Sequence, residues 1–558
     1  MNLLSAFVKD YRGFKDYDDM RAHFALDIPD DFNFSYDVID RYAREAPNKR
    51  AFVWCNDEGE EHIYNFAEIS RDSQRAAHFL VRHGIKKGDV VMLILRRRYE
   101  YWWLLPALIR IGAIAVPASN QLLKSDLVYR CNAAGVKMVI SFDDGHVLRE
   151  IEAAWGDCPT VKTLVSVVGG GDKWVDFHAE FDALPAACDS FPRPAGDAAT
   201  HNADTMLMYF TSGTSGYPKM VMHDFTYPLG HIVTALCWQN VIDDGLHISV
   251  AETGWAKAGW GKIYGQWICG TALFVYDMLS FAPDLFFKKI AHYKVTTFCA
   301  PPTAYRFLIR QDLSKYDLSN LAYCTTAGEA LNSEVFNKFY EKTGLKIHEG
   351  FGQSETAVLA GTFPGMEVKP GSMGKAAPGC DLQILRGDGK KCRALETGSM
   401  MVRISDGARP AGLLVGYYKN PEQTQAALGG NWYDTGDTAY YDDDGYIWYV
   451  GRHDDLIKSS GYRISPFEVE SVLQQHPAVL ECAVTGMADP KRGQVVKATV
   501  VLTAGYTASR ELEIELKTFA KEHLALYKLP RVVNFVDELP KTTSGKIRRV
   551  QIREDDNR

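Results

Sequence analysis

Apolar and polar positions alternate with two different periods through the first third of the chain. Apolar residues recur at helical spacing up to Gly84, and a short continuous apolar run follows at residues 90–95. A second helix is predicted over residues 99–111, which Gly112 ends, and a strand over residues 113–116. This order predicts an α/β fold with mainly parallel, helix-covered sheets. The apolar face of the first helix consists of Ala76, Ala77, Leu80 and Val81.

The pattern changes late in the chain. Residues 435–451 alternate around a turn that contains Gly445, which is a strong hairpin signal and predicts a β-hairpin-rich subdomain. The chain beyond it predicts a small α+β unit with helices near residues 466–475 and 510–523. We therefore expect a large N-terminal domain and a small, mobile C-terminal domain, at residues 1–453 and 454–558.

Composition and charge exclude several classes of protein. With 46% hydrophobic and 24% charged residues, the chain is typical of a globular protein. The net charge of -8 gives no sign of a basic nucleic-acid-binding surface, so no nucleic acid is expected as a partner. The longest apolar run, residues 101–116, is interrupted by Pro106 and Arg110 and falls short of the roughly 20 residues of a membrane span. No membrane span is predicted.

The N-terminus and the cysteines bear on location. The first residues soon become charged and lack the apolar core of a secretory signal. The 11 cysteines are scattered singly without a C-x-x-C pair, which predicts reduced core thiols rather than disulfides or a zinc site. Both features indicate a cytoplasmic protein.

The segment YFTSGTSGYPKM at residues 209–220 has the composition of a phosphate-binding loop. Glycines let backbone N–H groups curl around phosphate oxygens, hydroxyl groups add donors, and a lysine adds positive charge. The segment does not have Walker A spacing. A flexible Gly/Ser linker is the alternative interpretation. Its hydroxyl, glycine and lysine positions are Thr211, Ser212, Gly213, Thr214, Ser215, Gly216 and Lys219.

Four further segments follow this loop in order along the chain. They are TTAGEAL from Thr325, HEGFGQSETA from His348, WYDTGDTAYYDDDGYIWYVGRHDDLIKSSGYRISPFEVE from Trp432, and LPKTTSGKIRR from Leu539. Together with the loop they resemble the core motifs of the adenylate-forming superfamily, which includes acyl-CoA synthetases, firefly luciferase and peptide-synthetase adenylation domains. The resemblance runs from near residue 35 to the end of the chain and is greatest to the medium-chain acyl-CoA synthetases.

The resemblance implies an ATP-dependent acyl-CoA synthetase, an acid-thiol ligase that forms AMP. Such an enzyme joins a carboxylic acid to AMP with release of pyrophosphate, and then transfers the acyl group to the thiol of coenzyme A. A small-molecule carboxylic acid is therefore the implied substrate, and ATP, Mg2+ and coenzyme A are the implied cofactors.

The residues of the nucleotide site follow from the resemblance by position. The loop from Thr211 to Lys219 would hold the β- and γ-phosphates, and Thr211 is also assigned to catalysis. Glu355 would act in catalysis and bind Mg2+. Asp437 would accept hydrogen bonds from the ribose hydroxyls, with Arg452 on the other side of the ribose. The other cofactor-binding positions are Gly328, Glu329, Ala330, Gly350 and Phe351 around the adenine, together with Gly352, Gln353, Ser354, Thr356 and Lys458.

Three positions in the C-terminal domain carry the remaining roles. Asp454 resembles a hinge whose backbone rotation would produce domain alternation. Lys546 resembles the catalytic lysine, which would stabilise charge on the α-phosphate during adenylation. Gly461 would give the pantetheine arm of coenzyme A room to approach. Acetylation of Lys546 by a lysine acetyltransferase, reversed by a deacetylase, would remove the charge and inhibit adenylation.

The acyl group is predicted only by class. Residues 251–264, AETGWAKAGWGKIY, resemble a segment that forms one wall of the acyl pocket in acetyl- and medium-chain acyl-CoA synthetases. Trp255, Gly259 and Trp260 are the pocket candidates. Acetyl-CoA synthetases carry a bulky Trp at the position of Gly352, so we expect the glycine to open room for a short-to-medium-chain or branched fatty acid.

Other functions remain open at this point. An aryl, benzoate-type CoA ligase would use the same motifs, and an acyl-AMP ligase would use an acceptor other than coenzyme A. An inactive nucleotide-binding scaffold would keep the fold but lose Lys546, Glu355 or Asp437, all of which are present. A simple ATPase would release ADP instead of AMP.

Overall fold

The computed structural model describes residues 1–211, 218–329, 331–407, 409–460, 462–541 and 547–556. One of its two large sheets has eight strands in the order β19-β9-β8-β4-β3-β5-β6-β7. The central pairs from β8 to β7 are parallel, and β9 and β19 extend the sheet antiparallel. The strands are β3 (Val90–Leu93), β4 (Ile114–Pro117), β5 (Val136–Ser141), β6 (Thr163–Ser166), β7 (Val175–Asp176), β8 (Thr205–Thr211), β9 (Lys219–Asp224) and β19 (Gly416–Tyr417).

The second large sheet has nine strands in the order β16-β15-β14-β13-β12-β10-β11-β1-β2. The six strands from β14 to β1 are parallel to their neighbours, and antiparallel strands close both edges. The strands are β1 (Arg50–Asn56), β2 (Glu61–Asn65), β10 (Leu246–Ser249), β11 (Ala272–Asp277), β12 (Thr297–Ala300), β13 (Tyr323–Ala327), β14 (Ile347–Phe351), β15 (Ala360–Gly361) and β16 (Lys375–Ala376).

Helices cover both faces of these sheets, as the sequence predicted. In the first part of the chain they are α1 (Leu4–Phe7), α2 (Tyr17–His23), η1 (Ser35–Ile39), α3 (Asp40–Glu45), α4 (Phe66–Arg82), α5 (Tyr101–Ile111), α6 (Lys124–Ala134), α7 (Val147–Trp155), α8 (Phe177–Asp182), η2 (Ala186–Asp189) and η3 (Gly196–Ala198). Further along they are α9 (Tyr227–Ile232), η4 (Val233–Trp238), α10 (Ala256–Gly261), α11 (Tyr264–Ile268), α12 (Pro283–Tyr293), α13 (Pro302–Leu308), η5 (Leu313–Lys315), α14 (Ser333–Thr343) and α15 (Pro421–Leu428).

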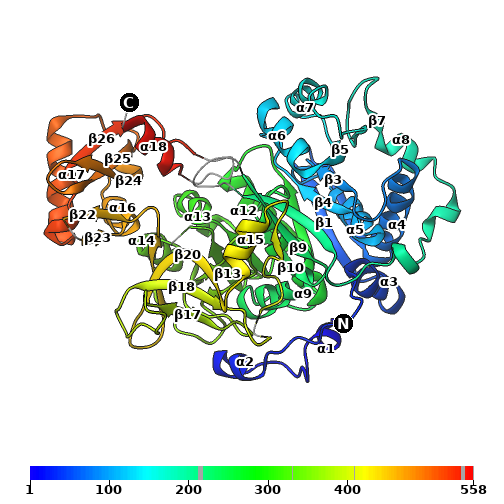
Figure 1. Cartoon of the computed structure of the whole chain (residues 1–558), viewed down its shortest axis with the longest axis horizontal. Coiled ribbons are helices and arrows are strands. Elements are labelled where there is room, and N and C mark those ends of the chain that lie inside the picture. The colour runs from blue at the N-terminus through cyan, green and yellow to red at the C-terminus, as the bar shows by residue number, and fades with distance from the viewer. Residues whose placement is uncertain (212–217, 330, 408, 461, 542–546, 557–558) are drawn as a thin grey trace.

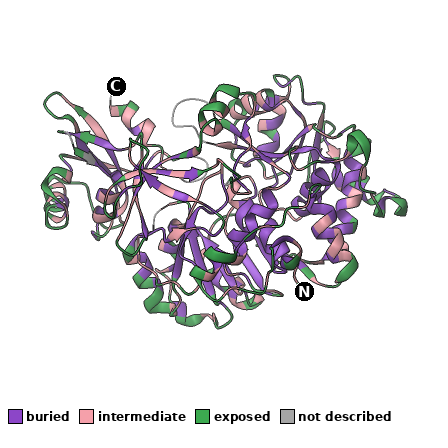
Figure 2. Ribbon diagram, turned by 60° about the horizontal axis from the view of Figure 1, so that its bottom comes forward, coloured by how far each residue is buried: buried purple, intermediate pink, exposed green. Residues whose placement is uncertain are grey.

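The core follows the period-2 alternation of the strands. Phe52 and Trp54 of β1 enter the cluster between the two large sheets, whereas Val53 and Cys55 enter the cluster beneath α12, α13 and α14. The eight-stranded sheet likewise shares the central cluster on one face and packs against α6 and α7 on the other. Figures 1 and 2 show the resulting layers, with the buried strands between helices whose outer faces are exposed.

Local signals explain the helix limits. Asn65 and Glu68 form a capping box at the start of α4, and Gly112 ends α5 in the left-handed conformation with φ 74°. The strand predicted at residues 90–95 is shorter, because β3 ends at Leu93. One part of the predicted apolar face is wrong. Val81 is 46% exposed, because it lies at the edge of the stripe that α4 turns toward the core.

The hairpin predicted at residues 435–451 is confirmed. It belongs to a third, antiparallel sheet in the order β17-β18-β20-β21. Its β20–β21 pairing sets Asp437 opposite Arg452. The strands are β17 (Leu382–Leu385), β18 (Gly398–Arg403), β20 (Trp432–Tyr441) and β21 (Ile447–Arg452).

The C-terminal part forms an α+β unit with a core of its own, at the opposite end of the molecule from α4 and α5 (Figure 1). Its five-stranded sheet has the order β23-β22-β25-β24, with β26 also paired to β25. The domain boundary at Asp454 stays a prediction. The elements are β22 (Ile457–Ser459), β23 (Tyr462–Ile464), α16 (Pro466–Leu473), β24 (Val479–Asp489), β25 (Gly493–Leu502), α17 (Arg510–His523), η6 (Leu526–Lys528), β26 (Val532–Val536) and α18 (Arg549–Asp556).

The structure describes the cysteines and the lengths of the helices. All 11 cysteines are buried as free thiols. In the part of the chain that the structure describes, no helix has the length and apolar character needed to cross a membrane.

A buried ion pair ties α5 to α3 and yields a prediction on stability. The guanidinium of Arg110 is fully buried and contacts Asp40 through two nitrogens, at 2.7 and 2.9 Å. Asp40→Ala leaves this cation unpaired in the core, so we expect a loss of about 3 to 5 kcal/mol in the free energy of unfolding. Urea unfolding followed by circular dichroism measures it. Lys338→Ala, which removes an exposed ion pair with Glu334, is the control and should cost under about 1 kcal/mol. Equal losses in the two variants would contradict the prediction.

Candidate active site

The predicted site residues gather where parallel strands end. Ala327, the last residue of β13, pairs with Gly350 near the end of β14. Gly328 and Glu329 therefore leave one strand beside the turn at residues 352–356 that leaves the other. In open α/β sheets, ligands bind outside the carboxyl ends of the strands. The topology thus brings the second and third sequence motifs to one edge of the nine-stranded sheet.

The ends of the phosphate-binding segment lie together. Thr211 at the end of β8 pairs with Lys219 at the start of β9. The Lys219 ammonium is 5.6 Å from the centre of the Tyr417 ring. Eight predicted site residues lie outside the described residues: Ser212, Gly213, Thr214, Ser215, Gly216, Ala330, Gly461 and Lys546.

Glu355 lies between the phosphate-binding segment and the hairpin subdomain. Its backbone carbonyl accepts a hydrogen bond from the Leu414 amide at 2.7 Å, and its Oε1 accepts one from the Tyr417 hydroxyl at 3.3 Å. Burial raises the pKa of Glu355, and the positive charges of Arg452 and Lys219 act in the opposite direction. The carboxylate is thus placed among cations yet poorly hydrated.

Asp437 is the most enclosed carboxylate of the site, with 3% of its surface exposed. The Gln353 amide donates to Oδ2 at 2.6 Å, and the Tyr449 hydroxyl donates to Oδ1 at 3.3 Å. Arg452 lies across the hairpin with its Nη1 3.5 Å from Oδ2. Because buried polar groups need hydrogen-bond partners, these contacts compensate for the burial of the Asp437 side chain.

Gln353 joins the turn after β14 to the hairpin. Its side-chain amide also donates to the Thr435 carbonyl at 2.6 Å, and its Oε1 accepts from the Tyr433 hydroxyl at 2.9 Å. Its backbone amide donates to the hydroxyl of the buried Thr356 at 3.0 Å. The neighbouring Ser354 carbonyl accepts from His223 Nε2 at 2.7 Å. The turn is therefore held on both sides.

Glycines in these motifs allow close packing. A Cβ at Gly350 would lie 2.3 Å from the Trp238 indole, so this position needs glycine to accommodate the ring. Gly328 has φ 105°, which an L side chain rarely adopts. Phe351 is partly buried beside them. Glu329 accepts a hydrogen bond from the Thr303 hydroxyl at 3.3 Å and lies 3.7 Å from Arg306.

The space expected at Gly352 is filled. A Cβ there would lie 2.3 Å from the Trp260 indole and 2.6 Å from the Ala357 carbonyl oxygen. The sequence expectation that this glycine opens room is therefore wrong for the volume next to it. The physical reason is tertiary: α10 places the Trp260 ring where a side chain at residue 352 would project. The structure does bring these two pocket candidates into contact.

The other acyl candidates lie on the same segment. Trp255 is partly exposed at the start of α10, and its indole donates to Glu252 Oε2 at 3.3 Å. Gly259 faces two phenol groups, since a Cβ there would lie 2.9 Å from the Tyr227 hydroxyl and 3.1 Å from that of Tyr209.

Of the last two predicted residues, Asp454 contacts this cluster through Arg452 and Lys458 does not. Lys458 is exposed on β22 of the C-terminal unit, and the structure does not bring it to the nucleotide residues. Asp454 is half-exposed, with a carboxylate oxygen 3.8 Å from Arg452 Nε.

Sequence reasoning missed several residues that build the site. Tyr417, Tyr433 and Tyr449 orient its carboxylates and amide, but isolated tyrosines carry no motif signal. Lys257 donates to the Ala327 carbonyl at the end of β13. It lies within the segment already singled out at residues 251–264, so this segment could have pointed to it.

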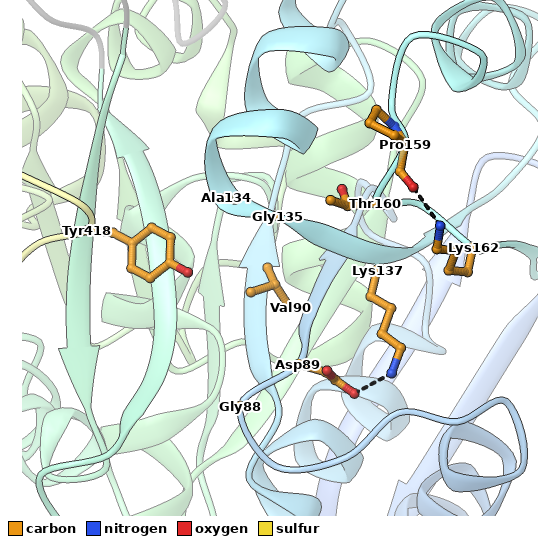
Figure 3. A pocket seen from close by; sticks show the side chains of 10 residues that line it. All are labelled: Gly88, Asp89, Val90, Ala134, Gly135, Lys137, Pro159, Thr160, Lys162 and Tyr418. Carbon is orange, nitrogen blue, oxygen red and sulfur yellow. Dashed lines mark hydrogen bonds and ion pairs between the residues drawn. The ribbon is translucent and has the colours of Figure 1, made fainter.

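An open pocket of 390 Å³ lies elsewhere, at the amino ends of β3 and β5 (Figure 3). There Lys137 contacts Asp89 at 2.8 Å and Lys162 donates to the Pro159 carbonyl at 2.7 Å. Tyr418 faces them from the other side (Figure 3). None of the predicted site residues that the structure describes lines this pocket. Its lysines already contact protein groups, so we place the active site at the carboxyl edge instead.

Comparisons with known proteins match this arrangement. The family model for AMP-binding enzymes matches residues 39–418, and that for the AMP-binding enzyme C-terminal domain matches residues 468–546. The chain is 37% identical to acyl-coenzyme A synthetase ACSM3 of Mus musculus, over 98% of this chain and 95% of the relative. It is 39% identical to acyl-coenzyme A synthetase ACSM5 of Rattus norvegicus, over 94% and 91%.

Solved structures agree with the fold. The anthranilate CoA ligase AuaEII, in complex with anthranoyl-AMP, superposes with a TM-score of 0.85 at 27% identity, covering 95% of this chain and 98% of that one. An acyl-CoA synthetase from Brucella canis superposes with a TM-score of 0.73 at 30% identity, covering 97% and 99%.

These relatives contradict the cytoplasmic location predicted from the sequence, because the names of the ACSM synthetases place them in mitochondria. The prediction rested on the lack of a secretory signal and on the scattered, reduced cysteines. Mitochondrial targeting uses amphipathic, arginine-rich segments instead of an apolar core, so that observation does not separate the two compartments.

The five motifs predicted from the sequence, the strand ends that bring their described residues together and the full-length likeness to known synthetases lead to one conclusion: the chain belongs to the AMP-binding enzyme family and is an ATP-dependent, AMP-forming acyl-CoA synthetase.

Proposed function

We propose that this synthetase activates a short-to-medium-chain or branched fatty acid. The observation that carries the proposal is the contact of Gly352 with the Trp260 indole. A ring in this place limits how far an acyl chain extends past residue 352, which disfavours long chains. The mainly apolar segment around α10 favours an alkyl group over a charged one. An aryl acid is the second candidate, because AuaEII is an anthranilate CoA ligase and a further structural neighbour is a benzoate CoA ligase.

We assign the nucleotide to the cluster around Asp437. A carboxylate accepts several hydrogen bonds at once, so contacts with Gln353 and Tyr449 are compatible with ribose binding. Arg452 supplies positive charge beside the same group. Lys219 and the loop before it serve the β- and γ-phosphates in this assignment, and residues 328–329 and 350–351 flank the adenine.

The proposed chemistry has two steps. A carboxylate oxygen of the acid attacks the α-phosphorus of ATP while the bond to pyrophosphate breaks, giving acyl-AMP. The thiol of coenzyme A then loses its proton and its sulfur attacks the acyl carbon, and the bond to AMP breaks. Lys546 stabilises the charge that develops on the α-phosphate in the first step. Rotation at Asp454 between the steps, and control by acetylation of Lys546, stay predictions.

Glu355 fits a Mg2+ role in this proposal. Mg2+ keeps several waters and uses one or two carboxylates with the substrate phosphates, so it needs no dedicated cage of protein ligands. In the described part of the chain, no group of three or more His, Cys, Asp or Glu side chains is arranged to hold a metal. A single carboxylate beside Lys219 matches that mode of binding. When bound, the ion neutralises charge on the phosphates.

The function is tested by carboxylate-dependent ATP–pyrophosphate exchange. We expect exchange with acids between propionate and octanoate or their branched forms, and weaker exchange with acetate and benzoate. Lys546→Ala should lower exchange by about 100-fold or more. Lys541→Ala, whose side chain pairs with Glu481 at 2.7 Å, is the matched control and should retain it. Exchange with benzoate alone would favour the aryl function, and exchange with no acid would overturn the proposal.

The raised pKa of Glu355 predicts a pH dependence. A glutamate with a raised pKa loses its charge at a higher pH than usual on acidification, and Mg2+ needs the carboxylate. We therefore expect kcat/KM for MgATP to fall as the pH drops through a pKa above the ordinary value of 4.5. Pyrophosphate exchange across pH at saturating acid measures it. Glu355→Gln should remove this acid limb; a limb that persists unchanged in the variant would belong to another group.

The acyl-length proposal predicts a change of specificity at Trp260. Trp260→Ala removes the ring beside Gly352, and each added methylene in an apolar site is worth roughly 1 to 3 kcal/mol. We expect the ratio of kcat/KM for octanoate to that for butyrate to rise at least about tenfold. The ratio corrects for any loss of folded protein. Phe307→Ala, at an exposed ring on α13, should leave it unchanged. An unaltered ratio in Trp260→Ala would remove the basis of the proposed acid class.

A further inference from the structure

Arg97 and Glu252 form an incomplete charge pair at the carboxyl ends of the two large sheets. Arg97 lies in the turn between β3 and α5, and Glu252 lies between β10 and α10. Glu252 is the charge that acts most strongly on the pKa of Arg97, and Arg97 is the charge that acts most strongly on the pKa of Glu252. Both residues are described, yet no nitrogen–oxygen contact within 4.0 Å joins them.

Each partner keeps one buried polar atom without a protein partner. These atoms are Arg97 Nε, a hydrogen-bond donor, and Glu252 Oε1, an acceptor. Burial lowers the pKa of the guanidinium and raises that of the carboxyl group, so both are poorly hydrated. Buried polar groups nearly always have a hydrogen-bond partner, so an unpaired donor and acceptor on attracting side chains call for a third group.

Other hydrogen bonds fix the position of Arg97 and of the turn that carries it. Its Nη2 donates to the Val250 carbonyl at 3.2 Å, and its own carbonyl accepts from the Trp54 indole at 2.7 Å. The neighbouring Arg96 carbonyl accepts from the amide of Thr253 at 2.9 Å and also from its hydroxyl. The turn that carries Arg97 is therefore bound to the segment that carries Glu252.

Hydrogen bonds also fix the position of the Glu252 side chain. Its Oε2 accepts from the Trp255 indole at 3.3 Å and from the Ser119 hydroxyl at 3.5 Å. Gly254 packs so tightly that a Cβ there would lie 2.4 Å from the backbone of Ala118. Both of these hydrogen bonds use Oε2, and the backbone of Asn120 also favours the charged form of Glu252. Oε1 has no hydrogen-bond partner in the protein.

A group that fits into the gap between the two side chains must accept a hydrogen bond from Arg97 Nε and donate one to Glu252 Oε1. An amide or a hydroxyl group does both, whereas an alkyl chain does neither. The reaction supplies such a group in only one place near Trp255. The fatty acid is apolar beyond its carboxylate, and we assigned the ribose of ATP to the Asp437 cluster and its β- and γ-phosphates to Lys219 and the loop before it. The pantetheine arm of coenzyme A carries amides and a hydroxyl.

We propose that Arg97 and Glu252 bind a polar group of the pantetheine arm, an amide or the hydroxyl, during thioester formation. The inference rests on the proposed function, because it takes Trp255 as part of the acyl site. It assigns to the second half-reaction Arg97, which lies in none of the motifs, and Glu252, which lies in the segment at residues 251–264 but had no role assigned to it. It also explains why the Glu252 carboxylate lies beside the proposed acyl site, although a fatty acid carries no positive charge for it to bind.

Glu252→Gln tests the proposal with little change of shape. The amide oxygen can still accept from Trp255, but the amide nitrogen then faces Arg97 Nε and replaces an acceptor by a donor. Thioester formation is measured from synthetic acyl-AMP, so the result does not depend on which acid the enzyme activates. We expect kcat/KM for coenzyme A to fall about tenfold or more, and adenylation, followed by pyrophosphate exchange, to fall far less.

The acceptor is varied to identify the group that binds. Pantetheine should show the same loss in Glu252→Gln as coenzyme A, whereas an alkanethiol without amide or hydroxyl should react equally slowly with variant and parent. Arg97→Lys, which keeps the charge but removes the Nε donor, should repeat the pattern. Glu334→Gln, at an exposed carboxylate on α14, is the matched control and should leave every acceptor unaffected.

Two outcomes would overturn the proposal. An equal loss with all thiols and in pyrophosphate exchange would mean that Glu252 only holds Trp255 in place. No loss with any acceptor would mean that the gap holds water alone. Failure of the proposed function itself looks different, because the parent enzyme would then form no thioester from synthetic acyl-AMP.

Discussion

The parallel pairing of β10, β12, β13 and β14 is the constraint on which the site depends. Parallel neighbours end at the same edge, so segments far apart in the chain leave the sheet side by side. Gly328 and the turn at residues 352–356 owe their proximity to the register that sets Ala327 opposite Gly350. The eight-stranded sheet adds its own ends, with Arg97 after β3 and Thr211 at the end of β8. A shift of register in either sheet would separate groups that the chemistry needs together.

Two charged groups of the site, Asp437 and Arg452, come from an antiparallel hairpin and not from the parallel strands. Asp437 and Arg452 face each other because an antiparallel hairpin pairs them directly. The amide of Gln353 then joins this hairpin to the parallel sheet through Asp437 and Thr435. The neutral side chain of Gln353 thus fixes the Asp437 carboxylate relative to the parallel sheet. Burial makes such contacts worth more than they would be at the surface, since water competes for them less.

Much of the fold and of the candidate site could be predicted from the sequence, for reasons that differ between residues. The helix at residues 510–523 coincides with α17, because Ser509 caps it and a regular apolar face follows. Motif order placed Glu355, Asp437 and Arg452 together, because their contacts arise within elements that carry strong local patterns. The volume at Gly352 could not be predicted, since a ring from a distant segment fills it. Tyr417 escaped notice for a similar reason, because its partner Glu355 becomes a neighbour only after the chain has folded.

The contact between Gly352 and Trp260 also limits the order in which this enzyme could change by single mutations. A side chain added at residue 352 first would collide with the ring and with the Ala357 carbonyl, which cannot move without the backbone. Shortening Trp260 first removes the ring but leaves the Ala357 carbonyl, so a side chain at residue 352 would still need a shift of the backbone. The change at residue 352 would therefore be less harmful after Trp260 has been shortened than before it. Descendants of this chain that acquire a bulky residue 352 should therefore carry a small residue 260, and that correlation would record the order of their history.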